Sequence, residues 1–208
     1  MASLKDKTIK GVIWSAVDRI SAQGIQFVFS ILIARLLVPE DYGIIAMLGV
    51  FLGVSQTFID SGFGSALIRK VDRTEADFST VFYFNIVIAI LFYLALYFAA
   101  PAIANFYNTP LLVPVTRVVA LNLVIGSFSG IHNAKLSIAI DFKSKAKISV
   151  LSAILTGCVG LWMAYSGYGV WALVVQTVFA SFIRTVMLWW IVKWHPQLIF
   201  SWKSFREL

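Results

Sequence analysis

Charged residues are scarce in this sequence. Only 13% of its 208 residues are Asp, Glu, Lys or Arg, and 60% are apolar, whereas a soluble domain has roughly 25% charged residues. With this composition and a mean hydropathy of +0.86, the chain cannot cover a water-exposed surface with polar side chains. A soluble fold is therefore excluded, and we expect lipid to be the main solvent.

Cysteine and histidine are almost absent. The single cysteine, Cys158, excludes an intramolecular disulfide and a multi-cysteine metal site. The two histidines, His132 and His195, are not spaced with carboxylates for metal binding. No Walker-type phosphate loop or dinucleotide fingerprint occurs, because Gly62-Phe63-Gly64 lacks the third glycine and the preceding strand. We therefore expect no catalytic residues, no metal and no cofactor, and a protein that is not an enzyme.

Apolar runs of membrane-spanning length follow one another along the chain. A spanning helix needs ~20 mostly apolar residues, and six runs satisfy this requirement, at approximately residues 11–37, 43–68, 79–101, 111–131, 148–165 and 170–193. The connectors are too short to hold a soluble domain. We predict an all-α polytopic membrane protein in which residues 1–194 form a lobe of six transmembrane helices and residues 195–208 form a cytoplasmic tail or begin a seventh helix.

The net charge of +7 does not indicate a nucleic-acid partner, because the basic residues lie in short segments between apolar runs rather than on one soluble face. Among the connectors on one side of the predicted bundle, Arg35 is the single basic residue. The other side carries Lys5, Lys7, Lys10, Arg69, Lys70, Arg73, Lys135, Lys143, Lys145, Lys147, Lys193, Lys203 and Arg206. Positively charged loops are retained in the cytoplasm, which predicts that both termini are cytoplasmic.

Polar residues form a stripe along the first predicted helix. At 100° per residue, an arc of about 80° contains Ser15, Arg19, Gln23, Gln26 and Ser30. A stripe of this length suits the wall of a water-filled cavity. The alternative is adhesion to a neighbouring helix through Gln and Ser side chains, which is common in membrane bundles.

Arg19 and Arg184 lie at similar depths. Counted at ~1.5 Å per residue, Arg19 is ~12 Å and Arg184 ~14 Å from the same membrane side, and Asp60 lies near that level. An Arg19–Asp60 ion pair is one interpretation. The other is an anion site, because a guanidinium can donate two parallel hydrogen bonds to a phosphate. The candidate substrate-binding residues are Arg19, Arg184, Gln23, Gln26 and Asp60.

Three sequence motifs together resemble the Wzx-type polysaccharide transporters, in the superfamily that includes MATE-type exporters. They are ARLLVPEDYG at 34–43, DSGFGSALI at 60–68 and APAIANFY at 100–107. The resemblance covers essentially the whole chain. In these motifs we expect Pro39 to stop the first helix and Gly43 to let the second begin close-packed.

The resemblance implies one six-helix lobe of a MATE-like flippase in the bacterial inner membrane. Such a flippase translocates undecaprenyl-pyrophosphate-linked oligosaccharide for surface polysaccharide biosynthesis by alternating access. The implied partners are this lipid-linked substrate, membrane lipid, a second six-helix lobe or another copy of the chain, and the polysaccharide polymerase machinery. Two alternatives are an ion-coupled exporter of drugs or small molecules and a membrane-embedded glycosyl or acyl transferase. The first would need intramembrane carboxylates and the second an interfacial acid–base group.

Overall fold

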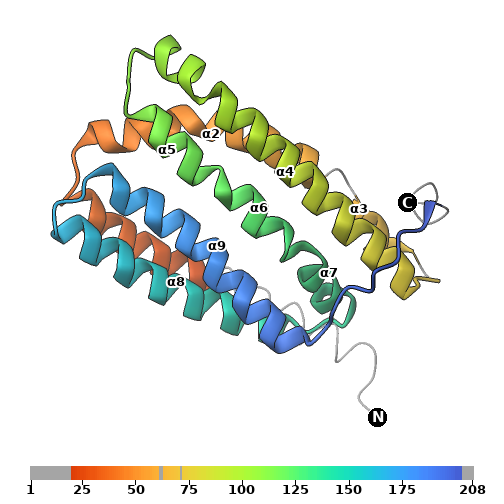
Figure 1. Ribbon diagram of the computed structural model, residues 1–208. Coiled ribbons are helices and arrows are strands. Elements are labelled where there is room, and N and C mark those ends of the chain that lie inside the picture. Colours follow the sequence, from red (N-terminus) through yellow and green to blue (C-terminus); the bar gives the residue numbers. More distant parts are fainter. Residues whose placement is uncertain (1–19, 61–62, 71, 203–208) are drawn as a thin grey trace.

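The computed structural model describes residues 20–60, 63–70 and 72–202, which form an all-α bundle without a strand. The first helix is described over Ile20–Ala34. The helices that follow are α2 (Pro39–Asp60), α3 (Phe63–Arg69), α4 (Glu75–Phe106), α5 (Leu112–Val119), α6 (Leu121–Ser127), α7 (Gly130–Ile138), α8 (Phe142–Tyr165) and α9 (Val170–Val192). They run along one direction of the bundle, with α5, α6 and α7 following one another in line (Figure 1). The prediction of an all-α polytopic membrane protein is confirmed.

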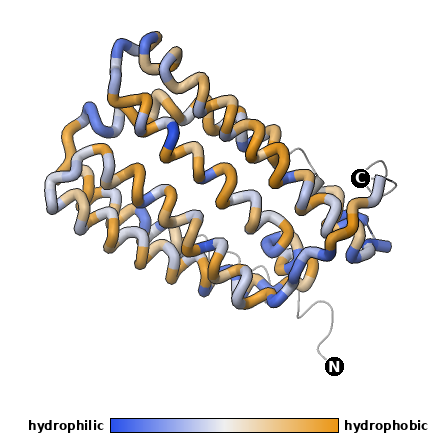
Figure 2. The backbone as a smooth tube through the Cα atoms, viewed as in Figure 1, coloured by the Kyte–Doolittle hydropathy of each residue, from blue (hydrophilic) through white to orange (hydrophobic). Residues whose placement is uncertain are grey.

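Five segments within the described residues are long and apolar enough to cross a membrane. They are Pro39–Ile59, Glu75–Phe106, Leu112–Ile138, Phe142–Tyr165 and Val170–Val192, while the apolar helix Ile20–Ala34 is shorter. Large apolar side chains such as Phe98 and Trp190 are more than 70% exposed. Figure 2 shows hydrophobic residues along most of each helix and hydrophilic stretches mainly at the helix ends. Such an exposed apolar surface fits lipid contact rather than water.

The two ends of the bundle differ in charge. Figure 1 shows the connections that follow the first helix, α4 and α8 at one end, and α3, α7 and the segment after α9 at the other. The second end, which we call the basic end, carries the basic residues of 69–73 and 135–147 together with Lys193. Arg35 is the basic residue in the connections at the opposite end.

The second helix begins earlier than expected. Pro39 does not stop the first helix, which already ends at Ala34: it is the first residue of α2, a position where its missing N–H costs nothing and its fixed φ suits the helix. The expected close packing at Gly43 is wrong, because a Cβ built there meets no atom within 4 Å among the described residues. The residues 43–68 predicted as one helix are divided between α2 and α3.

Helix α4 is longer than the predicted 79–101 because a capping box starts it at the basic end. The Thr74 hydroxyl accepts from the Asp77 amide at 3.3 Å, and the Asp77 carboxylate accepts from the Thr74 amide at 2.8 Å. These two reciprocal hydrogen bonds satisfy two backbone N–H groups that would have no partner in an uncapped helix. Asp77 is buried and also binds the Lys70 ammonium at 3.1 Å. The helix then continues through Pro101 to Phe106.

The run predicted at 111–131 is one membrane span of three short helices that reaches Ile138. Serine hydroxyls coincide with the second break: Ser127 donates to the Val124 carbonyl and Ser129 to the Gly126 carbonyl, both at 2.7 Å. Such local bonds compete with the regular helical ladder.

At the start of α8, the Ser144 hydroxyl and amide both donate to Asp141, and this lowers the pKa of the Asp141 carboxyl.

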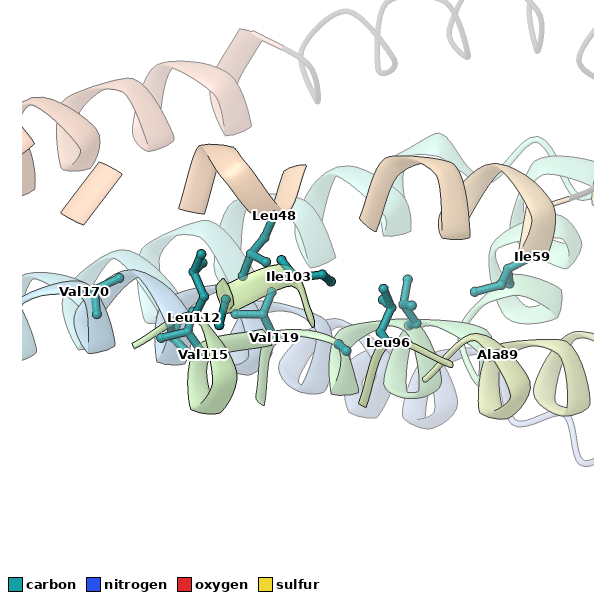
Figure 3. Packing of buried hydrophobic residues seen from close by; sticks show 13 residues of the cluster. Leu48, Ile59, Ala89, Leu96, Ile103, Leu112, Val115, Val119 and Val170 are labelled. Atoms are coloured by element: carbon teal, nitrogen blue, oxygen red, sulfur yellow. The ribbon is translucent and has the colours of Figure 1, made fainter. Parts of the chain in front are cut away.

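The largest apolar core joins α2, α4, α5, α6 and α9. Figure 3 shows Leu48 of α2 beside Ile103 of α4, with Leu112, Val115 and Val119 of α5 on the same side of the cluster, and Leu96 and Ile59 further along the bundle. All of these side chains are at most 8% exposed. In lipid this cluster gains little from leaving water, so close packing supplies the attraction between the helices.

Helix α8 contacts its two neighbours through glycines. A Cβ at Gly157 would collide with the Phe29 ring of the first helix, and a Cβ at Gly160 would lie 2.8 Å from Cδ of Gln176 on α9. Small residues allow helices to approach closely in a membrane. The two glycines therefore set the distances between α8 and both partners.

The segment after α9, residues 193–202, lies across α4 and α7 at the basic end. The Trp194 indole donates to Glu75 Oε2 at 2.6 Å, and His132 Nε2 donates to the Trp194 carbonyl at 3.2 Å. Backbone amides of Gln197 and Ser201 donate to hydroxyls of α4 at 3.0 Å. Of the predicted tail 195–208, the described part is irregular through Ser201; residues 203–208 lie outside the described residues.

Labelling of single cysteines tests the orientation. In a Cys158→Ala background, cysteines at Glu40 and Ser166 are expected to react with an impermeant thiol reagent applied from outside, and those at Arg73 and Lys147 are not. The excess of positive charge at the basic end gives this direction. All four cysteines should react after membrane disruption, which provides the control. Reaction of Lys147→Cys in intact cells would contradict a cytoplasmic basic end.

Replacing Gly157 tests the packing of the first helix on α8. We expect Gly157→Ala to destabilise the protein by about 1 to 3 kcal/mol, because overpacking outweighs the helix-propensity gain of alanine. The matched control is Gly53→Ala, where a Cβ meets no described atom within 4 Å. The measurement is thermal unfolding in detergent, and Phe29→Leu should restore part of the loss. Equal melting temperatures for the two alanine variants would argue against close packing at Gly157.

Candidate functional site

Arg184 of α9 lines three neighbouring cavities, whose volumes are about 300, 350 and 130 Å³. It lies eight residues before the end of α9, or ~12 Å along the helix, and it is exposed rather than packed among apolar side chains. A charge at this depth costs several kcal/mol unless it faces a wet cavity or a partner. The cavities therefore account for an arginine in this apolar helix.

The first cavity lies between the first helix, α8 and α9. Its polar lining comprises Gln23, Gln26, Ser149, Ser152, Thr156, Ser181 and Arg184. On each helix these residues are three or four positions apart, and this spacing places them on one face. Alanines at positions 22, 153 and 180 complete the wall. Small residues between polar ones leave room for a ligand or water.

The second cavity extends from Arg184 toward α2, α6 and α7. Its lining adds Gln56, Asn122 and Asn133 to Ser181 and Arg184. The Ser181 hydroxyl donates to Asn122 Oδ1, which joins α9 to α6. The third cavity adds Lys145, whose ammonium donates to the Ser137 hydroxyl at 2.6 Å. Amides, hydroxyls and two cations thus surround a branched polar space.

The charge of this space is positive. None of the described residues that line the three cavities is acidic. Arg184 has no ion-pair partner within residues 20–60, 63–70 and 72–202. The other described arginine within a span, Arg117, places its guanidinium 4.2 Å from the centre of the Tyr97 ring and lines none of these cavities. Arg184 is therefore the guanidinium that the described structure presents to the cavities.

Comparison with known proteins assigns the family. A family model described as "polysaccharide biosynthesis protein" matches residues 32–208, a range that includes every described cavity-lining residue except those of the first helix. The chain belongs to the polysaccharide biosynthesis protein family. The resemblance to Wzx-type transporters is thereby confirmed.

Three relatives of this polysaccharide biosynthesis protein have informative names. It is 25% identical to the teichuronic acid biosynthesis protein TuaB of Bacillus subtilis, over 100% of this chain and 43% of the relative. It is 24% identical to the succinoglycan biosynthesis transport protein ExoT of Rhizobium meliloti, over 94% and 40%. It is also 24% identical to the lipopolysaccharide biosynthesis protein WzxC of Escherichia coli, over 74% and 31%.

The chain spans less than half the length of each of these relatives. No solved structure matches this family member.

Three of the predicted site residues of this family member lie together, since Gln23, Gln26 and Arg184 line the first cavity. Arg19 lies outside the described residues. Asp60 ends α2, but its side chain lies outside the described part. A role in substrate binding stays a prediction for all five residues.

The sequence analysis missed the polar face of α8 and the asparagines of the fourth span. Ser149, Ser152 and Thr156 repeat at helical spacing inside an apolar run, and the wheel applied to the first helix would have found them. Asn122 and Asn133 are eleven positions apart, about three helical turns, so the same wheel places them on one face, but Asn133 lies beyond the predicted run 111–131. Within the described residues no group of three His, Cys, Asp or Glu side chains could hold a metal ion.

Cysteine accessibility tests whether the first cavity holds water. In the Cys158→Ala background, Gln26→Cys and Ser152→Cys should react with a small hydrophilic thiol reagent in intact membranes, because a thiol needs water to ionise. The matched controls are Val28→Cys and Leu151→Cys, whose parent side chains are exposed on the apolar surface and should stay unmodified. Equal reaction at all four positions would argue against a polar cavity on this face.

Proposed function

We propose that the chain is one lobe of a flippase that translocates undecaprenyl-pyrophosphate-linked oligosaccharide across the bacterial cytoplasmic membrane. The flippase works by alternating access and serves surface polysaccharide biosynthesis. A single observation carries this proposal: Arg184 is exposed to polar cavities whose described lining contains no acid. A cation without a resident counter-ion favours an anionic ligand.

The substrate's chemistry matches the lining. Arg184 can donate two parallel hydrogen bonds to a phosphate group, and the Lys145 ammonium adds charge at the third cavity. The amides of Gln23, Gln26 and Asn122 both donate and accept hydrogen bonds. They suit sugar hydroxyls, which also do both. The prenyl chain would remain in the surrounding lipid.

The relatives' names support transport rather than catalysis. One relative is named a succinoglycan biosynthesis transport protein; the lipopolysaccharide biosynthesis protein supports the polysaccharide pathway and does not itself name transport. Because the chain spans under half of each, we propose that a second six-helix lobe or another copy of the chain completes the pathway. Polysaccharide polymerase machinery would take up the delivered substrate. In this scheme the basic end and both termini are cytoplasmic.

Arg19 and Asp60 belong to the same proposal. Arg19 continues the stripe of Gln23 and Gln26 by one helical turn, so it would extend the cationic surface. Asp60 lies at the end of α2 and would hold one arginine in place when the substrate is absent. Export of a cationic drug fits less well, because a cationic cargo requires carboxylates in the cavity.

Replacement of Arg184 tests the proposal. In cells that depend on this protein for export, Arg184→Lys should lower polysaccharide export about tenfold, because lysine keeps the charge but loses one charge-assisted hydrogen bond. Arg184→Gln should lower it further. The assay is export complementation in cells that lack the transporter, with membrane expression measured in parallel. The matched control is Lys147→Gln, an exposed basic residue that lines none of the cavities.

Normal export by Arg184→Gln at normal expression would remove Arg184 from the mechanism. A further pair of variants separates the roles of Arg19. If Arg19 binds substrate, Arg19→Ala loses export while expression is kept, and adding Asp60→Ala does not help. Recovery of both expression and export in the double variant would instead assign Arg19 a structural ion pair with Asp60.

A further inference from the structure

A fourth cavity lies outside the Arg184 site, at the basic end. It is a groove of about 460 Å³ between the start of α4 and the end of α7, lined by Arg73, Phe78, Lys135, Ile138 and Ala139. It shares no lining residue with the three cavities around Arg184. This groove can therefore bind a ligand other than the proposed transport substrate.

Lys135 is held in a fixed position at the groove. Its ammonium donates to Glu75 Oε1 at 3.0 Å and lies 4.4 and 4.8 Å from the centres of the Phe78 and Trp194 rings. Two ring faces and one carboxylate restrict the ammonium, so little conformational entropy remains to be lost when a ligand binds. The same Glu75 is anchored by the Trp194 indole.

Arg73 supplies the second cation. Its Nε donates to the Lys70 carbonyl at 2.8 Å, which orients the guanidinium and leaves its terminal nitrogens without an acid partner in the described part of the chain. The nearby Asp77 is paired with Lys70, and Asp72 is exposed and does not line the groove. Arg73, Lys135 and Glu75 together carry one net positive charge.

The remaining surface of the groove is apolar. Phe78 is 7% exposed, and Ile138 and Ala139 stand at the end of α7. Since Glu75 begins one membrane span and Ile138 ends another, the groove lies at the depth of the lipid headgroups. One net positive charge beside an apolar wall at this depth complements an amphiphile with one phosphate charge.

We infer that this groove binds an anionic phospholipid of the surrounding bilayer. Arg73 and Lys135 contact the phosphodiester, and the first carbons of an acyl chain lie against Phe78, Ile138 and Ala139. The bound lipid would cover the junction at which α4, α7 and the 193–202 segment meet. This site is independent of the proposed transport function.

Native mass spectrometry of the purified chain tests the inference. We expect phosphatidylglycerol to bind more tightly than phosphatidylcholine of the same acyl chains, because the choline headgroup cancels the phosphate charge. Arg73→Gln should weaken phosphatidylglycerol binding roughly tenfold, the effect of one charge-assisted contact. Arg69→Gln, an exposed arginine of the same end that does not line the groove, should change it less than about twofold.

A second variant tests the apolar wall without a change of charge. Ala139→Phe fills the groove and should also reduce phosphatidylglycerol binding, while thermal unfolding without added lipid checks that each variant folds. Glycerol 3-phosphate, which has no acyl chain, should not displace the lipid. The inference is overturned by equal binding of the two lipids, by equal losses in Arg69→Gln and Arg73→Gln, by unchanged binding in Ala139→Phe, or by displacement with glycerol 3-phosphate.

Discussion

The structure depends on one constraint: a polar group within the membrane needs a hydrogen-bond partner that lipid cannot supply. Lipid offers no hydrogen bonds, so polar side chains in the spanning helices must face one another, a wet cavity or the helix ends. The apolar surface points outward, and the glutamines, asparagines, serines and Arg184 converge inside. The same constraint explains the glycines of α8, because lipid does not drive helices together and close contact must do so.

A network of polar contacts then fixes the basic end. Glu75 accepts hydrogen bonds from both the Trp194 indole and the Lys135 ammonium. The His132 ring stacks on the Trp189 ring, with 4.7 Å between the ring centroids. These contacts join residues more than fifty positions apart, from α4, α7, α9 and the 193–202 segment. The end of α9 is therefore tied to α4, while Arg184 lies two turns further into the same helix.

The fold was largely predictable from sequence, because apolar length is a strong signal for a membrane span. Helix ends were less predictable, because they depend on local hydrogen bonds. Thr74 and Asp77 start α4 before its apolar run begins, and Pro39 belongs to the helix that follows it. Within the site, Gln23, Gln26 and Arg184 were predictable because they interrupt apolar runs. Asn122 and Asn133 share a helical face, but only the fold shows that this face lies beside Ser181 and Arg184.

The two cationic sites differ in what surrounds the charge, and this difference indicates different ligands. Arg184 stands among amides and hydroxyls that can exchange hydrogen bonds with a moving, hydrated molecule. Lys135 is confined by two aromatic rings and a carboxylate, and the neighbouring surface is apolar. A polar environment tolerates many orientations of a ligand, as the proposed transport would require. A rigid cation beside an apolar wall selects one orientation, with the phosphate at the helix end and the hydrocarbon toward the bilayer.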